Sequence, residues 1–303
     1  MEIIEIKPRG YCKGVVKSLA LAKKVRKENP TVPITILGAL VHNKYISQAL
    51  ESLNIKTIHY SSLSKLEQLE MIESGIVVFS AHGIAKEVIE KAQSQGLTVV
   101  DATCVDVTKT HQCIERYLQQ DYQVIYIGKK FHPETEAILS NYDVHFIETD
   151  NDVSKLYINS DKIVVTNQTT LSILQIQSIY DSLLKRYPQI EIENDICLAT
   201  TIRQEAVIKN QDLDALVVVG DPMSNNTAML ASIGKNSGIP LVQRIETLQD
   251  LDLSDFREDM RIGVTAGAST PPYLCWQVIN YLKELDINSP TPFDPVDLSK
   301  ILD

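Results

Sequence analysis

Three of the five cysteines in this 303-residue chain occur at nearly equal intervals. Cys12, Cys104 and Cys197 are 92 and 93 positions apart, and each follows a short apolar run and precedes a helical pattern. This spacing predicts one site to which three related segments each contribute a thiol. Soft thiolates from distant parts of a chain usually hold zinc or an iron–sulfur cluster, and a helix N-terminus lowers the pKa of a thiol toward the ligating form. The sequence therefore predicts a metal centre.

The other two cysteines, Cys113 and Cys275, lie inside helical patterns and have no counterpart in the other segments. Free cysteine often packs as a small hydrophobic residue, so we expect both in the core. The N-terminus has neither a basic start nor a long apolar stretch, and so does not resemble a secretory signal. We therefore expect a reducing, cytoplasmic setting without disulfides.

Two further strand patterns repeat at a similar period. One ends in glycine followed by a polar loop, in ITILGALVHN, QVIYIGKKFHPE and ALVVVGDPMSNN. The other ends in small and hydroxylated residues, in GIVVFSAHG, KIVVTNQTT and RIGVTAGAST. Each is an unbroken apolar run followed by a helical pattern, which is typical of parallel strands covered on both faces. We therefore predict an α/β fold of three small parallel-sheet lobes.

The repeats place the lobes at residues 1–96, 97–189 and 190–283, with one of the three periodic cysteines in each. Residues 284–303 carry three prolines among small and acidic residues. We predict that they form an extended tail, which is either disordered or wrapped on a neighbouring lobe.

Polar side chains follow six of the predicted strands. In open parallel sheets, ligands bind beyond the carboxyl ends of the strands, where the N-termini of the following helices also lie. Free backbone N–H groups and positive dipole ends at these helix starts suit a multiply charged anion such as a diphosphate. The side chains are those of His42, His82, His132 with Glu134, Gln168 with Thr169, Ser224 with Asn225 and Asn226, and Ser269.

Ordinary helix capping also explains several of these residues. Thr169, Ser224 and Ser269 taken singly are common N-cap types, and Pro133 and Glu134 suit any first helical turn. The three histidines favour function, because they end predicted strands at equivalent depths, whereas the other three histidines of the chain have no repeat partner.

Composition and missing motifs exclude several classes of protein. A net charge of −10 argues against non-specific nucleic-acid binding. No apolar run approaches the roughly 20 residues needed to cross a bilayer, so we expect no membrane association. The chain contains no Walker A, Gly-x-Gly-x-x-Gly, Gly-x-Ser-x-Gly or His-Glu-x-x-His motif, nor a Cys-x-x-x-Cys-x-x-Cys run.

In their order along the chain, these motifs resemble the hydroxymethylbutenyl diphosphate reductase family, the last enzymes of the methylerythritol phosphate route to isoprenoids. The resemblance covers the chain up to its tail. The matching segments are Pro8 to Cys12, Val41 to Asn43, Ser80 to Gly83, Asp101 to Cys104, His132 to Glu134, Gln168 to Ser172, Cys197 to Thr200 and Gly263 to Ser269.

The resemblance implies a trefoil of three α/β lobes around one central 4Fe–4S cluster, with Cys12, Cys104 and Cys197 as its protein ligands and one iron left open. In the family, that iron takes the hydroxyl oxygen of 4-hydroxy-3-methylbut-2-enyl diphosphate. Two electrons and two protons then remove this oxygen as water, and the products are isopentenyl and dimethylallyl diphosphates. The implied electron donor is an external ferredoxin or flavodoxin, since the chain itself contains no nicotinamide or flavin motif.

The resemblance also assigns roles to the residues at the strand ends. It implies that Glu134 is the proton source and that Thr169 holds the reacting end of the substrate. The charge of the diphosphate would raise the pKa of nearby histidines and favour their imidazolium form. The residues implied to bind the diphosphate are His42, His82, His132, Ser224, Asn225, Asn226 and Ser269.

The chain departs from the family pattern at two places. Val105 follows Cys104 where the family commonly has proline, which we expect to alter only the entry into the helix. After Ser224, Asn225 and Asn226 the chain continues Thr-Ala-Met, where a Ser-Asn-Arg run often stands. The missing arginine predicts weaker support for this loop and a lower affinity.

Three other functions remain open from the residues. Quinolinate synthases and diphthamide-forming enzymes resemble the chain in architecture, with three lobes and one cluster cysteine from each, but have different motifs. A non-catalytic iron–sulfur carrier or sensor would not need a pocket lined with histidines. A zinc hydrolase is disfavoured because catalytic zinc usually has histidine among its ligands.

Overall fold

The structure is a computed structural model that describes residues 1–302 of the chain. It divides the chain into two compact units, which are described separately. Unit 1 comprises residues 1–16, 41–53 and 198–303, and unit 2 comprises residues 17–40 and 54–197. Within the described residues, the strands form three four-stranded sheets, and every strand pairs in parallel with its neighbours. The predicted α/β class with three parallel-sheet lobes is confirmed.

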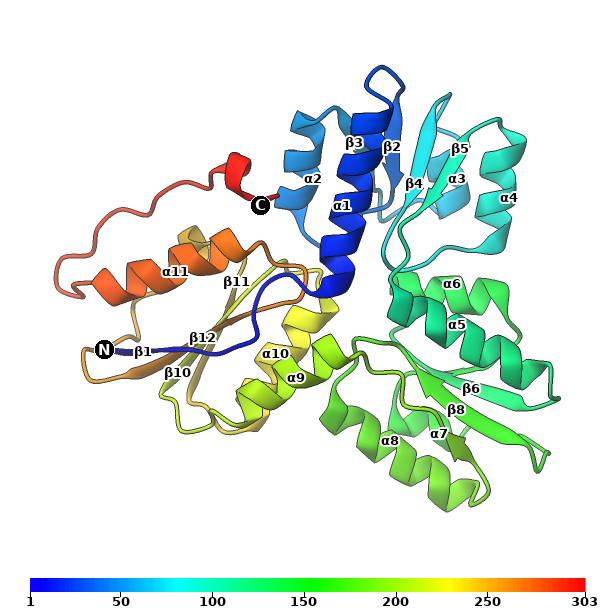
Figure 1. Ribbon diagram of the computed structural model, residues 1–303. Coiled ribbons are helices and arrows are strands. Elements are labelled where there is room, and N and C mark those ends of the chain that lie inside the picture. Colours follow the sequence, from blue (N-terminus) through cyan, green and yellow to red (C-terminus); the bar gives the residue numbers. More distant parts are fainter. Residues whose placement is uncertain (303) are drawn as a thin grey trace. The chain divides into compact units, whose positions relative to one another are not determined.

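The first sheet lies in unit 2 and has the strand order β3-β2-β4-β5 (Figure 1). Its strands are β2 (Ile34–Leu37), β3 (Ile55–Ile58), β4 (Ile76–Phe79) and β5 (Thr98–Asp101). The helices of this part of the chain are α1 (Lys13–Glu28), α2 (Lys44–Ser52), α3 (Lys65–Leu69) and α4 (Lys86–Ser94).

The second sheet also lies in unit 2, with the order β7-β6-β8-β9. Its strands are β6 (Gln123–Ile127), β7 (His145–Ile147), β8 (Ile163–Asn167) and β9 (Glu191–Ile192). The accompanying helices are α5 (Val105–Leu118), α6 (Pro133–Asn141), α7 (Asp150–Val153) and α8 (Ile173–Arg186).

The third sheet lies in unit 1, with the order β1-β12-β10-β11. Its strands are β1 (Glu2–Glu5), β10 (Ala215–Val219), β11 (Leu241–Ile245) and β12 (Arg261–Ala266). The accompanying helices are α9 (Leu198–Ile208), α10 (Asn225–Asn236), α11 (Pro272–Glu284) and the short 3-10 helices η1 (Leu248–Asp250) and η2 (Leu298–Lys300).

The central strands are apolar and buried. β2, β4 and β10, with the sequences ITIL, IVVF and ALVVV, are buried at every position. This is expected for parallel strands with helices on both faces. Because burial of one such aliphatic side chain contributes about 1.5–3 kcal/mol, these strands are firmly held and fix the loops at their carboxyl ends.

The predicted lobe boundaries at 1–96, 97–189 and 190–283 differ from the observed sheets at each junction. β1 was expected in the first lobe but pairs with β12, β5 was expected in the second but pairs with β4, and β9 was expected in the third but pairs with β8. Each strand that precedes a periodic cysteine thus forms the edge of a different sheet from the one predicted. An apolar run identifies a strand but not its partner, and this is the reason for the error.

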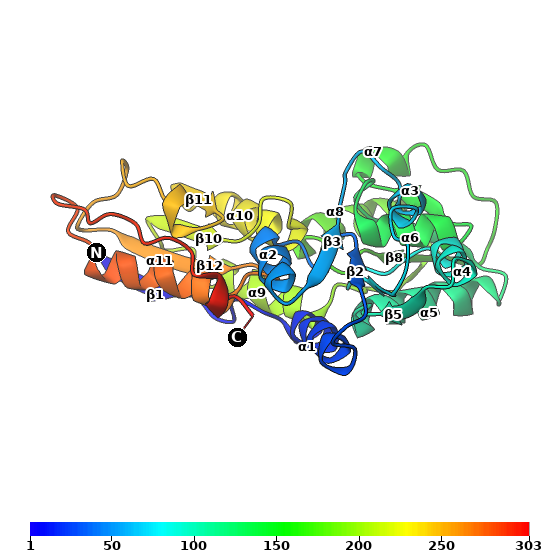
Figure 2. The same cartoon turned by 90° about the horizontal axis from the view of Figure 1, so that it is seen from above.

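The tail, predicted for residues 284–303, packs on α11 within unit 1. In Figures 1 and 2 it leaves the end of α11 and returns beside that helix. Tyr281 donates to the carbonyl of Thr291 at 3.0 Å, and Tyr273 accepts from the backbone N–H of Asp297 at 3.4 Å, so the tail runs antiparallel to α11. The side chain of Ile301 is fully buried, and its carbonyl accepts from the Tyr11 hydroxyl at 2.6 Å. The described part of the tail is therefore wrapped: it packs on α11 and, through η2, also contacts α2, which belongs to the predicted first lobe.

No helix within residues 1–302 combines the length and the apolar character that a membrane span requires.

Candidate active site

The three periodic cysteines stand at helix starts, as predicted. Cys12, Cys104 and Cys197 immediately precede the first residues of α1, α5 and α9. The Cys12 Sγ accepts from the backbone N–H of Val15 at 3.5 Å, in the first turn of α1. An N–H donor and the positive end of a helix both stabilise a thiolate.

One backbone hydrogen bond is repeated at all three cysteines. In each case the cysteine N–H donates to the carbonyl of the second residue after a central strand, namely β12, β4 or β8. The bonds are Cys12 to Ala268 at 3.0 Å, Cys104 to Ala81 at 2.9 Å and Cys197 to Thr169 at 3.0 Å. The three cysteines therefore occupy equivalent positions in three equivalent loops, as their spacing indicates.

The remaining cysteines are core residues. Cys275 is buried, and Cys113 packs partly buried against a hydrophobic cluster of the second lobe. Burial raises the pKa of Cys275 to about 12 and that of Cys113 to about 11. Both thiols pack in apolar surroundings, which confirms the prediction that they belong to the core.

The donor set fits an iron–sulfur centre in its chemistry. No cysteine within residues 1–302 forms a disulfide, and the three at helix starts are only partly buried. The described residues contain no group of three or more His, Cys, Asp or Glu side chains gathered closely enough to hold a metal ion. Cys12 belongs to unit 1, whereas Cys104 and Cys197 belong to unit 2, so their convergence on one cluster stays a prediction.

The polar loops follow the two central strands of each sheet. In all three sheets, the strand order reverses between these two strands, which are β2 with β4, β6 with β8 and β10 with β12. Ligands of doubly wound α/β sheets bind at such reversal points, beyond the carboxyl ends of the strands. The topology thus supports the predicted location of the site.

Glu134 and Thr169 form the most specific contact of these loops. The backbone N–H of Thr169 donates to one carboxylate oxygen of Glu134 at 2.8 Å, and its hydroxyl donates to the other at 2.9 Å. Both residues are buried, Glu134 with only 1% of its surface exposed. Burial raises the pKa of Glu134 to about 7, although the two bonds from Thr169 favour the ionised form. A carboxyl group with this pKa exchanges a proton readily near neutral pH.

His132 caps the helix that carries Glu134. Its Nδ1 accepts from the backbone N–H of Glu134 at 3.2 Å, so this nitrogen carries no proton and the ring proton lies on Nε2. The His82 ring is perpendicular to that of His132, with 5.6 Å between their centroids. An imidazolium form of His132 would have to give up this capping bond, so the cap favours the tautomer that donates through Nε2.

Gln168 links two of these loops, a role that its place in the sequence did not reveal. Its side-chain oxygen accepts from the backbone N–H of Lys129 at 2.9 Å, and its amide donates to the Thr170 hydroxyl at 2.9 Å. Gln168 is fully buried, so this bond connects the loop after β6 to the loop after β8. It thereby helps to hold Glu134 opposite Thr169.

The repeated glycine at the end of the strands has a packing reason. A methyl group at Gly128 would lie 2.5 Å from the Thr135 hydroxyl, and one at Gly220 would lie 2.5 Å from the Thr227 hydroxyl. Both threonines are in the first turn of the following helix. Glycine therefore allows each helix start to approach the end of its strand.

A second group of predicted residues lies in unit 1. Ser224 caps α10 by accepting from the Thr227 N–H at 3.3 Å, and Ser269 donates to the carbonyl of His42 at 3.0 Å. The Asn226 side chain donates to the Thr200 hydroxyl at 3.1 Å and accepts from the Ala268 N–H at 3.0 Å. Ser224, Asn225, Asn226 and Ser269 are all buried.

Each unit thus brings together one group of the predicted residues. Unit 1 holds Cys12, His42, Ser224, Asn225, Asn226 and Ser269, and unit 2 holds His82, Cys104, His132, Glu134, Thr169 and Cys197. That both groups serve one pocket stays a prediction.

The two departures from the family pattern have local explanations. α5 begins at Val105 without proline, with Cys104 at its N-cap. Met229, at the place of the missing arginine, is buried. The Asn226 side chain is held by the Thr200 hydroxyl and the Ala268 N–H.

Comparison with known proteins identifies the same family as the sequence motifs. A model of the LytB protein family matches residues 3–283. The chain is 43% identical over 310 residues to the 4-hydroxy-3-methylbut-2-enyl diphosphate reductase of Anoxybacillus flavithermus, covering 100% of this chain and 98% of that protein. It is 42% identical over 310 residues to the protein of the same name from a Geobacillus species, again covering 100% of this chain and 98% of the relative.

Two solved structures of similar fold carry the name of the same reductase. The E-1-hydroxy-2-methyl-but-2-enyl-4-diphosphate reductase of Plasmodium falciparum is 30% identical and superposes with a TM-score of 0.85, over 95% of this chain and 89% of that chain. A structure of (E)-4-hydroxy-3-methyl-but-2-enyl diphosphate reductase, described as the terminal enzyme of the non-mevalonate pathway, is 28% identical, with a TM-score of 0.65 over 94% of this chain and 100% of that chain.

Proposed function

The chain belongs to the LytB protein family, whose relatives are named as reductases, and on this premise we propose that it removes the hydroxyl group of 4-hydroxy-3-methylbut-2-enyl diphosphate by reduction. The products would be isopentenyl and dimethylallyl diphosphates, which makes this the last step of the methylerythritol phosphate route. The reaction consumes two electrons and two protons and releases water. The proposed cytoplasmic location fits a described chain whose cysteines form no disulfide.

The contact between Glu134 and Thr169 carries the proposal. Loss of a hydroxyl group as water requires a proton donor that is active near neutral pH, and the buried Glu134 has this property. Because the Thr169 hydroxyl lies 2.9 Å from the Glu134 carboxylate, it can pass a proton from Glu134 to a substrate oxygen. A non-catalytic iron–sulfur carrier would have no use for such a pair.

The chain's own residues account for substrate binding. We assign the diphosphate to His42, His82, His132, Ser224, Asn225, Asn226 and Ser269. His132 would donate through Nε2, because its Nδ1 is used in the helix cap. Ser224 keeps its hydroxyl proton for an anion, because its oxygen accepts the capping bond. Neutral donors of this kind bind an anion within an acidic protein without needing buried cations.

Cys12, Cys104 and Cys197 are the residues that would hold the 4Fe–4S cluster. When bound, a cluster with three cysteine ligands would transfer electrons to the substrate and would leave one iron without a protein ligand. An external donor must reduce the cluster, since the chain has no nicotinamide or flavin motif. We propose a ferredoxin or flavodoxin as the donor.

The test is anaerobic reconstitution with iron and sulfide, followed by turnover of the allylic diphosphate with reduced methyl viologen. We expect a broad visible absorption, consumption of the substrate and both isoprenoid diphosphates. Cys104→Ser should lose the cluster, whereas Cys275→Ser, at a buried position, is the matched control and should keep it. A reconstituted cluster without turnover would point to the carrier, and a colourless zinc protein would exclude the proposal.

A further inference from the structure

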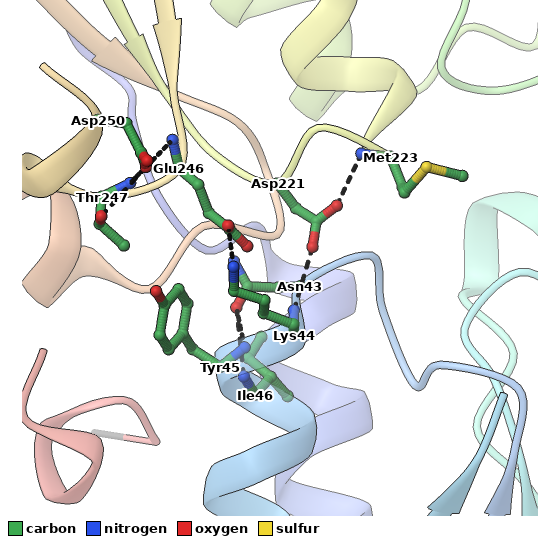
Figure 3. A network of polar contacts seen from close by, with 9 residues as sticks. All are labelled: Asn43, Lys44, Tyr45, Ile46, Asp221, Met223, Glu246, Thr247 and Asp250. Carbon is green, nitrogen blue, oxygen red and sulfur yellow. Dashed lines mark hydrogen bonds and ion pairs between the residues drawn. The ribbon is translucent and has the colours of Figure 1, made fainter. Parts of the chain in front are cut away.

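Asp221 joins two loops of unit 1 that carry predicted diphosphate ligands. One carboxylate oxygen accepts from the backbone N–H of Lys44 at 3.1 Å, and the other accepts from that of Met223 at 2.7 Å (Figure 3). Only 7% of Asp221 is exposed. Lys44 stands two residues after His42, and Asp221 stands three residues before Ser224. This single buried carboxylate therefore connects the start of α2 to the loop that leads into α10.

The first turn of α2 has no free donors left for an anion. Asp221 takes the N–H of Lys44, and the Asn43 side chain takes those of Tyr45 and Ile46 at 3.1 and 3.2 Å (Figure 3). The sequence had predicted that this helix start would offer its N–H groups to the diphosphate. Since they are occupied, the contribution of this loop must come from the His42 side chain, whose position depends on how α2 is held.

Two further contacts hold the same segment. The Lys44 ammonium pairs with the Glu246 carboxylate (Figure 3), but 54% of the lysine side chain is exposed, so solvent screens this pair. Ser269 donates to the His42 carbonyl at 3.0 Å. Of the contacts made by Lys44, the bond from its backbone to Asp221 is therefore the more protected.

A carboxylate is an unexpected neighbour for a diphosphate site. At short range a negative side chain repels an anionic ligand, so electrostatics alone disfavours Asp221 at this place. Two charge-assisted hydrogen bonds from backbone N–H groups stabilise the Asp221 carboxylate, and one of them connects its loop to the start of α2.

We propose that Asp221 is a positioning residue for the diphosphate site, in which it fixes the His42 loop against the loop that bears Ser224, Asn225 and Asn226. This inference rests on the proposed function. It concerns the binding of the diphosphate and leaves the Glu134 and Thr169 pair in unit 2 untouched.

Asp221→Asn tests the inference by the sign of its effect. Asparagine has one acceptor oxygen in place of two, so one of the two N–H groups loses its partner. If Asp221 positions the loops, KM for the allylic diphosphate and the Kd of inorganic diphosphate should both rise about tenfold, while kcat with reduced methyl viologen stays within a few-fold. If its charge merely repels the ligand, the same variant should bind diphosphate more tightly, and this outcome would overturn the proposal.

Two other variants complete the experiment. Lys44→Met removes the exposed ion pair but keeps the backbone N–H, and should change the Kd by less than about twofold. Asn43→Ala loosens the same helix start without changing any charge, and should weaken diphosphate binding like Asp221→Asn. Unchanged binding in Asn43→Ala and Asp221→Asn would refute positioning. Absence of both binding and turnover in the unaltered protein would instead refute the proposed function.

Discussion

Thr169 binds the Glu134 carboxylate with both its backbone N–H and its hydroxyl, at 2.8 and 2.9 Å. The same threonine accepts the backbone N–H of Cys197 through its carbonyl at 3.0 Å. One residue thus connects the proposed proton source to the segment of a proposed cluster ligand. The proposed proton source and the segment that carries Cys197 therefore lie next to each other within unit 2.

Glu134→Gln should lower turnover at least a hundredfold while leaving the cluster spectrum and substrate binding intact. General acid catalysis typically contributes a factor of about 10² to 10⁴, and glutamine cannot supply the proton. The measurement is turnover with reduced methyl viologen, which bypasses the protein donor. Glu136→Gln, at an exposed position in the same helical turn, is the control and should stay near the unaltered rate. Activity of Glu134→Gln within a few-fold of that rate would reduce Glu134 to a helix-start residue.

The turnover number should fall as the pH rises above about 7. Burial raises the pKa of Glu134 to about 7, with the negative charge of Asp195 acting in the same direction, so above this value the donor is increasingly deprotonated. A pH profile of kcat with the artificial reductant measures this limb. In Glu134→Gln, the residual kcat should no longer decrease above about pH 7. If the decrease persists in the variant, another group must cause it.

The same shift predicts a pH dependence of stability. The folded-state pKa of Glu134 lies above its usual 4.5, so the folded state binds a proton more tightly than the unfolded chain does. The resulting stabilisation is fully present below about pH 4.5, decreases as the pH rises through 7, and amounts to about 3 kcal/mol. Denaturant unfolding at a series of pH values should show this loss in the unaltered protein and a smaller one in Glu134→Gln.

His132→Asn should separate helix capping from diphosphate binding. Asparagine is a good N-cap, so it replaces the Nδ1 acceptor and preserves stability, but it lacks a ring donor at the position of Nε2. We expect weaker binding of inorganic diphosphate in both His132→Asn and His132→Ala, and a loss of about 1 kcal/mol in stability in the alanine variant alone. Calorimetric titration and thermal unfolding measure the two effects. Unaltered diphosphate binding in both variants, and in His82→Ala, would exclude these histidines from the site.

Features with a local cause could be predicted from the sequence. They are the strands, the helix starts at the three cysteines and the polar residues at the strand ends. Apolar runs of four to six residues can be stable only when buried, and the repeated glycines mark close approach of a helix to a strand. The identity of sheet partners has no such local signal. β1 therefore could not be assigned to β12, which lies more than 250 positions away.

Residues that act through the backbone of distant segments were also missed. Asp221 contacts the N–H of Lys44 across 177 positions, and a backbone donor leaves no trace in the amino-acid types. For the same reason, the sequence could not show that His132 uses Nδ1 to cap its own helix. The only available signal for Asp221 was its place directly after Gly220, in a loop that repeats the one after Gly128.

Ile301 should be the anchor of the C-terminal tail. It is fully buried although the tail around it is largely irregular, and its carbonyl accepts from Tyr11, the neighbour of Cys12. Truncation of a buried isoleucine to alanine costs about 2–5 kcal/mol, so Ile301→Ala should lower the free energy of unfolding by about that amount. Leu298→Ala, in the 3-10 helix η2 that directly precedes Ile301, is 39% exposed; it is the matched control and should cost less than about 1 kcal/mol. Urea titration of both variants compares them at a common slope. Equal and small effects would mean that the tail contributes little to folding, whereas a selective loss in Ile301→Ala would establish that residues beyond α11 stabilise the segment that leads into Cys12.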